Sequence, residues 1–178
     1  GNKSFVKQLK SDNTLIPLAV SLNNGEFFTG MSGNFLITNN GIIVIVGKTY
    51  PVVAAATDAS HPVAVGDVLY FSSSKNSRLT KFDLKQNKMD DIANVDPTDP
   101  IVDIEVDVLG RIYVLTAKAL YRYDNNNILT KLYDASGPLM NSMASMNGHH
   151  MLLSMGSKGL VLVDVDGKTA QIINVNTE

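Results

Sequence analysis

Three carboxylates at alternating positions are the residues of this chain best placed to do chemistry. Asp103, Glu105 and Asp107 are separated by single apolar residues. Because successive side chains of a β-strand point to opposite faces, the three carboxylates share one face. On a strand that lines a channel, such a row could bind a hard cation such as calcium. The simpler interpretation, which we favour, is the solvated face of a half-buried strand.

Other polar motifs of the sequence are less suited to catalysis or metal binding. His149 and His150 are adjacent, so on a strand they face opposite sides and cannot both bind one metal. His61 is the one other histidine of the sequence. Ser72 and Lys75 have the Ser-x-x-Lys spacing of some acyl-transfer enzymes, but that chemistry requires a helix, and here the motif follows a predicted strand. Asp164-Val-Asp166-Gly167 opens like a calcium loop yet lacks the later ligands, which predicts a turn.

Bulk composition limits the class of protein. With 178 residues, the chain is long enough for one sizeable core, and 44% hydrophobic and 18% charged residues suit an ordered domain. The net charge of -2, with scattered Lys and Arg, argues against a nucleic-acid partner. The absence of cysteine removes disulfides and thiolate catalysis from consideration.

The sequence contains no segment of the kind that enters a membrane. No run approaches the roughly 20 apolar residues of a membrane helix, and the N-terminus lacks the pattern of a signal peptide. We therefore expect no direct membrane insertion. Gly1 without a preceding Met looks like a processing scar, so a leader or anchor could have been removed.

The apolar stretches are those of an all-β chain. They are four to seven residues long, rich in β-branched and aromatic residues, and interrupted by turn dipeptides. The dipeptides that favour tight hairpin turns are Asn24-Gly25, Asn40-Gly41, Asn147-Gly148 and Asp166-Gly167.

One phrase occurs four times: a glycine, a β-favouring run ending at Thr or Ser, a short break, and a second apolar run. The copies begin at Gly33, Gly66, Gly110 and Gly148, and their first runs end at Thr38, Ser72, Thr116 and Ser154. Asp83, Asp124 and Asp164, which close the second run in the last three copies, are 41 and 40 residues apart. A period of about 40 residues with four short strands is typical of a β-propeller blade.

Extending the phrase on both sides predicts one domain over residues 1–178 with four blades of four strands. The units are residues 26–58, 61–95, 100–135 and 139–178, preceded by a partial blade at residues 1–21. An alternative register begins the first unit at Pro17. Because nothing at the C-terminus completes the partial blade, we expect a fragment of a larger propeller.

The third unit resembles a known repeat. Its segment from Asp107 to Asp124 has an acidic turn, a glycine, an apolar strand ending in Thr, and then Leu-Tyr-Arg-Tyr-Asp. In these features it resembles the two-component regulator propeller repeat. The family's usual Trp is absent, and Tyr113 stands nearest its position. The resemblance implies a periplasmic sensor region of a hybrid histidine kinase, a family that senses carbohydrate breakdown products.

These observations favour a non-catalytic sensing or interaction propeller outside the cytoplasm, although a cytoplasmic location stays open. Its partner would be a small molecule such as a carbohydrate, or other domains of the same receptor. No cofactor is expected, and calcium is the one candidate that the carboxylates suggest. The first alternative is a lactonase- or glycosidase-like enzyme whose channel holds a metal on Asp103, Glu105 and Asp107. The second is a scaffold that self-associates through open blade edges, since unpaired strands invite pairing.

Overall fold

A computed structural model describes residues 6–9, 15–18, 20, 22–46, 49–56, 58–73, 75–124, 126–135, 137 and 139–173, with the backbone alone for 6–9 and 15–18. Apart from one 3-10 turn at Gly156–Lys158, every regular element of these residues is a strand, so the prediction of an all-β chain is confirmed. The described part of the chain has no helix with the length and apolarity needed to span a bilayer.

The strands form four sheets of four strands and one hairpin, all antiparallel. The hairpin pairs β1 (Val6–Leu9) with β2 (Leu15–Leu18). The first sheet contains β3 (Phe28–Ser32), β4 (Phe35–Thr38), β5 (Gly41–Val44) and β6 (Val52–Ala55). The second contains β7 (Ser60–Val65), β8 (Val68–Ser73), β9 (Arg78–Asp83) and β10 (Lys88–Asn94).

The two remaining sheets repeat this order. The third contains β11 (Ile101–Val106), β12 (Ile112–Thr116), β13 (Ala119–Tyr123) and β14 (Leu129–Asp134). The fourth contains β15 (Ser142–Ser145), β16 (His150–Ser154), β17 (Leu160–Asp164) and β18 (Thr169–Ile173). Since Pro17 lies in β2, which pairs with β1 and not with the first sheet, the register that begins the first unit at Pro17 is not the one observed.

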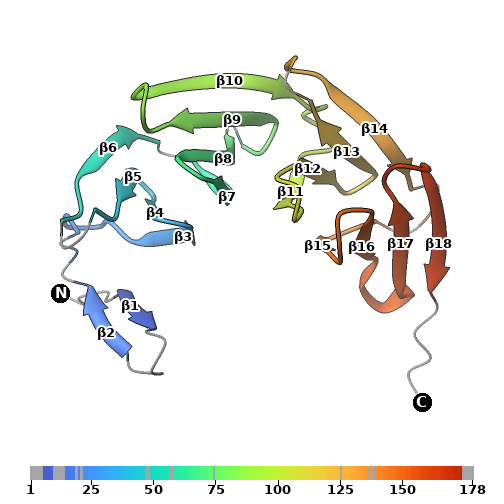
Figure 1. The fold of residues 1–178 in the computed structure, drawn as a ribbon, viewed down its shortest axis with the longest axis horizontal. Coiled ribbons are helices and arrows are strands. Elements are labelled where there is room, and N and C mark those ends of the chain that lie inside the picture. The colour runs from blue at the N-terminus through green and yellow to red at the C-terminus, as the bar shows by residue number, and fades with distance from the viewer. Residues whose placement is uncertain are drawn as a thin grey trace.

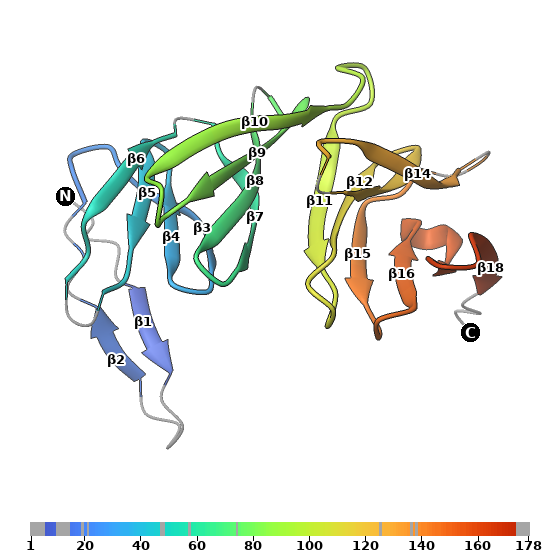
Figure 2. The same cartoon turned by 45° about the horizontal axis from the view of Figure 1, so that its top comes forward.

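The sheets stand around an open arc in the manner of propeller blades. Figure 1 shows the first strand of each sheet toward the centre and the fourth toward the outside. The first strands β3, β7, β11 and β15 contact one another in sequence order. In Figure 2 the β11–β12 and β15–β16 hairpins stand side by side. The predicted partial propeller, with four blades and an N-terminal partial blade, is thereby confirmed.

Three apolar clusters hold the blades together, one at each junction between neighbouring sheets. The first joins Phe35, Ile37 and Ile42 to Leu69, Phe71 and Phe82. The second joins Val63, Leu79 and Ile92 to Ile104, Ile112 and Val114. The third joins Tyr113, Leu115 and Leu120 to Met143, Met151 and Leu153. Four methionines of the last unit, Met140, Met143, Met151 and Met155, lie in this cluster, which is the commoner use of methionine, whereas Met146 is exposed.

The second strand of each blade shows that the repeated glycine does not mark equivalent positions. Counted from Gly66 and Gly110, Leu69 matches Tyr113, yet Leu69 faces the preceding blade and Tyr113 faces the following one. Tyr70, one residue later, faces the following blade as Tyr113 does. A shift of one residue reverses the face of a strand, so the alignment on glycine is wrong by one position in the second blade.

Different turn lengths explain the shift. In the second blade, Val65 pairs with Val68 across a two-residue turn. In the third, Val106 pairs with Ile112 across a turn of five residues. Gly66 and Gly110, both with positive φ, therefore occupy different places in their turns.

The threonine at the end of the second strand has a definite structural use. Thr116 Oγ1 donates to Asp99 Oδ2 at 2.7 Å and accepts from the backbone N–H of Ala119 at 2.9 Å. Thr38 repeats this arrangement with Glu26 Oε1 at 2.6 Å and Gly41 N–H at 3.0 Å. One hydroxyl thus caps the turn between the second and third strands and ties it to the connection from the preceding blade.

We predict that Thr116→Val lowers the free energy of unfolding by about 2 kcal/mol, because buried polar groups lose their partner. Asp99 is affected most, since its Oδ1 has no hydrogen-bond partner among the described residues and its Oδ2 would lose the one from Thr116. Thr116→Ser keeps the hydroxyl and should cost about 0.8 kcal/mol for the lost methyl. Urea unfolding of both variants checks this, and equal losses would contradict it.

Candidate functional site

The three carboxylates nominated by the sequence have different surroundings in the structure. Asp103 accepts hydrogen bonds from its neighbour Ile104 N–H at 2.9 Å and from Met143 N–H at 2.8 Å. Because Met143 belongs to β15, this carboxylate joins the inner strands of the third and fourth blades. Glu105 is half-buried, and its pKa is raised by burial and then by the charge of Asp103.

Asp107 lies just beyond β11, in the turn, and faces other groups. Among the described residues, no group of three His, Asp or Glu side chains is placed to hold one metal ion. The structure therefore brings Asp103 and Glu105 within each other's electrostatic influence but gives Asp107 a separate setting. The calcium site stays a prediction.

Asp107 is the centre of the turn between β11 and β12. Its Oδ1 accepts from the N–H groups of Leu109 at 2.9 Å and Arg111 at 3.0 Å, and its Oδ2 accepts from Arg111 Nε at 2.6 Å and Tyr113 Oη at 3.1 Å. The side chain is only 1% exposed. Burial acts to raise its pKa, but the hydrogen bonds from Arg111, Leu109 and Tyr113 outweigh burial and lower it.

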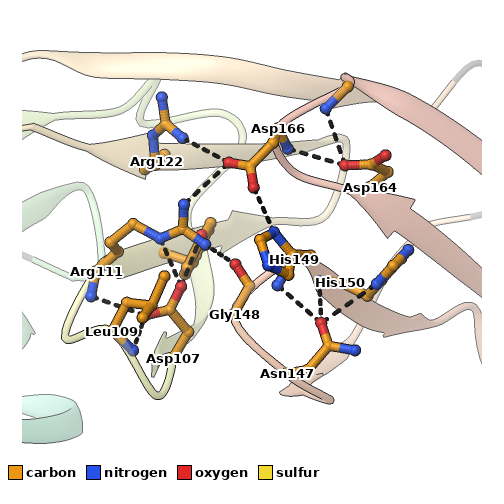
Figure 3. A network of polar contacts seen from close by, with 12 residues as sticks. Asp107, Leu109, Arg111, Arg122, Asn147, Gly148, His149, His150, Asp164 and Asp166 are labelled. Atoms are coloured by element: carbon orange, nitrogen blue, oxygen red, sulfur yellow. Dashed lines mark hydrogen bonds and ion pairs between the residues drawn. The ribbon is translucent and has the colours of Figure 1, made fainter.

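Arg111 connects this turn to the fourth blade, as Figure 3 shows. Its Nη1 donates to Asp166 Oδ1 at 3.0 Å, and its Nη2 donates to the carbonyl oxygen of Gly148. The guanidinium carbon lies 5.9 Å from the centre of the Tyr113 ring, within the range of a cation–π contact. All three nitrogens of Arg111 are thus engaged, and its position is fixed.

Asp166 is contacted by three basic side chains. Besides Arg111, it contacts His149 Nδ1 at 2.7 Å and Arg122 Nη1 at 3.7 Å, so its pKa is lowered, with the bond from His149 the largest cause. The neighbouring His150 is directed elsewhere, with Nδ1 3.2 Å from Asn147 Oδ1, as Figure 3 shows. The two histidines therefore do not converge on one ion.

The remaining motifs form turns and local contacts. Asp164 Oδ1 accepts the N–H groups of Asp166 and Gly167 at 3.0 and 2.9 Å, which makes this segment the turn that the sequence predicts. His61 Nδ1 lies 3.0 Å from Ser72 Oγ, and burial lowers the pKa of His61 while Asp103 opposes the shift. Lys75 lies in a turn, not on a helix beside Ser72.

A pocket of about 310 Å³ opens beside this network, between the second and third blades. Its walls are Tyr70, Leu109, Gly110, Arg111, Ile112, Arg122, Tyr123 and Asp124. The rings of Tyr70 and Tyr123 have centroids 6.1 Å apart and are inclined at 56°. Sequence reasoning identified none of these as site residues, because the pocket joins β8 to the ends of β12 and β13, which are more than 40 residues away in the chain.

We predict that Asp107→Asn lowers the free energy of unfolding by about 3 kcal/mol, because it leaves the Arg111 guanidinium without its buried counter-charge. The matched control is Asp67→Asn in the equivalent turn of the second blade, where the pair with Lys85 is exposed. That control should cost less than about 1 kcal/mol. Denaturant unfolding of both variants is the measurement, and equal losses would show that the Asp107 pair is no stronger than a surface pair.

Tyr113 should make stability depend on alkaline pH. Burial, and then Asp107, raise its pKa to about 12. Since the unfolded pKa is about 10, the folded state retains the phenol proton while the unfolded state loses it, so stability is unaffected below about pH 10 and falls from there to about pH 12. The loss should approach about 2.7 kcal/mol. Because the pKa values of Tyr70 and Tyr123 are also raised, Tyr113→Phe should reduce the loss of stability in urea unfolding across that range by this amount, and an unchanged slope would contradict the assignment.

Comparisons with known proteins identify the fold. No family model matches the chain. No curated protein matches it either. Solved structures do: a streptogramin B lyase is 13% identical with a TM-score of 0.76, over 98% of this chain and 63% of the lyase.

Two further solved structures share the fold. The extracellular domain of a protein assigned as a hybrid two-component system from B. thetaiotaomicron is 20% identical, with a TM-score of 0.61 over 80% of this chain and 21% of its own. YCF48 bound to D1 peptide is 15% identical, with a TM-score of 0.65 over 89% of this chain and 57% of its own. The chain spans less than two thirds of each of these proteins, and at such identities the similarity shows the propeller fold.

Proposed function

We propose that this chain is a sensing or interaction segment of an extracytoplasmic receptor of the two-component type and performs no chemistry itself. The observation that carries the proposal is the use of the carboxylates. Both oxygens of Asp107 accept hydrogen bonds, which come from Leu109, Arg111 and Tyr113. Asp103 accepts a hydrogen bond from the backbone of the adjacent blade. Neither is free to act as a general acid or base, whereas the neighbouring pocket offers aromatic and cationic walls suited to binding.

The fold comparisons support the same proposal. Extracellular domains of two B. thetaiotaomicron proteins assigned as hybrid two-component systems share this fold at 20% and 17% identity. Their location supports an extracytoplasmic setting for this chain. Two solved structures that share this fold are complexes, nidogen with laminin and YCF48 with D1 peptide, which supports partner domains of the receptor as an alternative to a small ligand.

A second candidate function is an enzyme, favoured by the similarity to streptogramin B and virginiamycin B lyases at TM-scores of 0.76 and 0.74. In that case Asp103 and Glu105, on the inner strand of the third blade, would be the residues to bind a metal such as calcium. Burial and then Asp103 raise the pKa of Glu105, and a bound cation would act in the opposite direction by stabilising the charged carboxylate.

One experiment separates the two functions. We expect a panel of mono- and disaccharides, sugar acids and short peptides to include compounds that raise the melting temperature of the protein and are recovered unchanged after incubation. Calcium should neither release heat in a titration nor alter melting. Turnover of a bound compound would overturn the sensing function. Calcium binding that is lost in Asp103→Asn would favour the enzyme, and concentration-dependent self-association with no ligand would favour the scaffold.

A further inference from the structure

We infer that the pocket beside Arg111 binds a small organic carboxylate whose acid group pairs with Arg122. This deepens the proposed sensing function and rests on it. The pocket lies between Tyr70 of β8 and the ends of β12 and β13, and its volume of about 310 Å³ is at the lower end for ligand sites. A compound about the size of a monosaccharide or of an aromatic acid matches this space.

Arg122 is the group that selects the ligand. Its side chain is 31% exposed, and its closest charged contact is Asp166 at 3.7 Å, beyond hydrogen-bond distance. Among the residues that the structure describes, the Arg122 guanidinium donates no hydrogen bond. A guanidinium carries five N–H donors in a planar fork that matches the two oxygens of a carboxylate. The nearest anion, Asp166, is already bound by Arg111 and His149.

Arg111 differs from Arg122, although both line the pocket. Its Nε, Nη1 and Nη2 each have a partner within the protein. Arg111 therefore contributes charge and a rigid wall, whereas Arg122 has donors to offer. Binding benefits from the free donors of Arg122 and from the fixed position of Arg111, because a pocket wall that is already rigid loses little entropy when a ligand binds.

The tyrosines give the pocket a second donor and a place for the ligand's body. No hydrogen bond reaches the Tyr70 hydroxyl from the described residues, and burial, followed by Asp83, raises its pKa, so it keeps its proton and can donate. The Tyr123 hydroxyl already donates to Asn127 Oδ1 at 2.9 Å, which leaves its ring as a flat wall. Leu109, 63% exposed at the pocket rim, adds apolar surface.

The one acid of the wall does not favour a cationic ligand. Asp124 Oδ1 accepts the N–H groups of Asn126 at 2.9 Å and Ile128 at 3.1 Å, so its charge is used to shape the turn after β13. Arg122 and Tyr70 offer donors that have no partner among the described residues, whereas Asp124, with Oδ1 occupied, offers only Oδ2 as an acceptor. A carboxylate attached to a flat or ring-shaped body is the ligand that satisfies both donors.

The test uses acids with matched neutral analogues on the intact protein at neutral pH. Phenylacetate is compared with phenylacetamide, and glucuronate with glucose, by titration calorimetry and ligand-observed NMR. We expect each acid to bind about tenfold or more tightly than its analogue, the factor that a charge-assisted hydrogen bond provides. A short peptide with a free C-terminal carboxylate, compared with its amide, distinguishes a peptide terminus from a free small molecule as the source of the acid group.

Variants locate the effect. Arg122→Gln should weaken binding of the acids about tenfold and leave the neutral analogues unchanged, and Tyr70→Phe should weaken binding about threefold. Arg78→Gln, which removes a half-exposed arginine paired with Asp91 in the second blade, is the control and should change neither. Unaltered melting of Arg122→Gln shows that it folds.

The outcomes separate this inference from the proposed function. It is overturned if acids and neutral analogues bind alike, if no acid binds, or if Arg122→Gln behaves as Arg78→Gln does. Should a saccharide or peptide of the wider panel stabilise the protein without turnover while Arg122→Gln binds it normally, the sensing function would stand and this pocket would not be its site.

Discussion

Burial of both faces of each sheet is the constraint on which the molecule depends. A twisted four-stranded sheet exposes an apolar row on either side, because its residues alternate between faces. In the third blade, Ile112 and Val114 pack on the second blade while Tyr113 and Leu115 pack on the fourth. Neither set could be covered by a sheet standing alone. The arc of blades is thus the consequence of two-sided strands.

The polar contacts of Asp107 and Arg111 between the third and fourth blades follow from this packing. Once Tyr113 is buried against the fourth blade, its hydroxyl needs a partner, and Asp107 provides it at 3.1 Å. The buried carboxylate in turn needs a counter-charge, which Arg111 supplies while reaching Gly148 and Asp166 of the next blade. Each buried polar group in this series therefore has the hydrogen-bond or charge partner that its burial requires. The pocket walls are a by-product of this chain of partners, since Arg111 belongs to both.

The strands could be predicted from the sequence because their signals are local. Alternating apolar runs mark the blades, and the contacts of Thr38 and Thr116 explain why a threonine ends the second strand of the first and third blades. The register of the second blade could not be predicted from its glycine, because turn length changes between blades. The Arg111 contacts were also out of reach, since Gly148 and Asp166 are 37 and 55 residues away in the chain. The one local signal for these contacts was the i,i+4 spacing of Asp107 and Arg111 within one turn.

The same constraint applies to the face of the fourth blade that points away from the third blade. Met151 and Leu153 face the third blade, so Leu152 and its cross-strand partner Leu162 point the other way. Leu152 thus occupies the position of Tyr70 and Tyr113, the residues that face the following blade in the second and third blades. Both leucines are partly exposed, and no described sheet covers them. Side chains at this position are the ones that the second and third blades pack against the following blade. The alternation that forms three blade junctions therefore leaves an apolar face on the fourth blade.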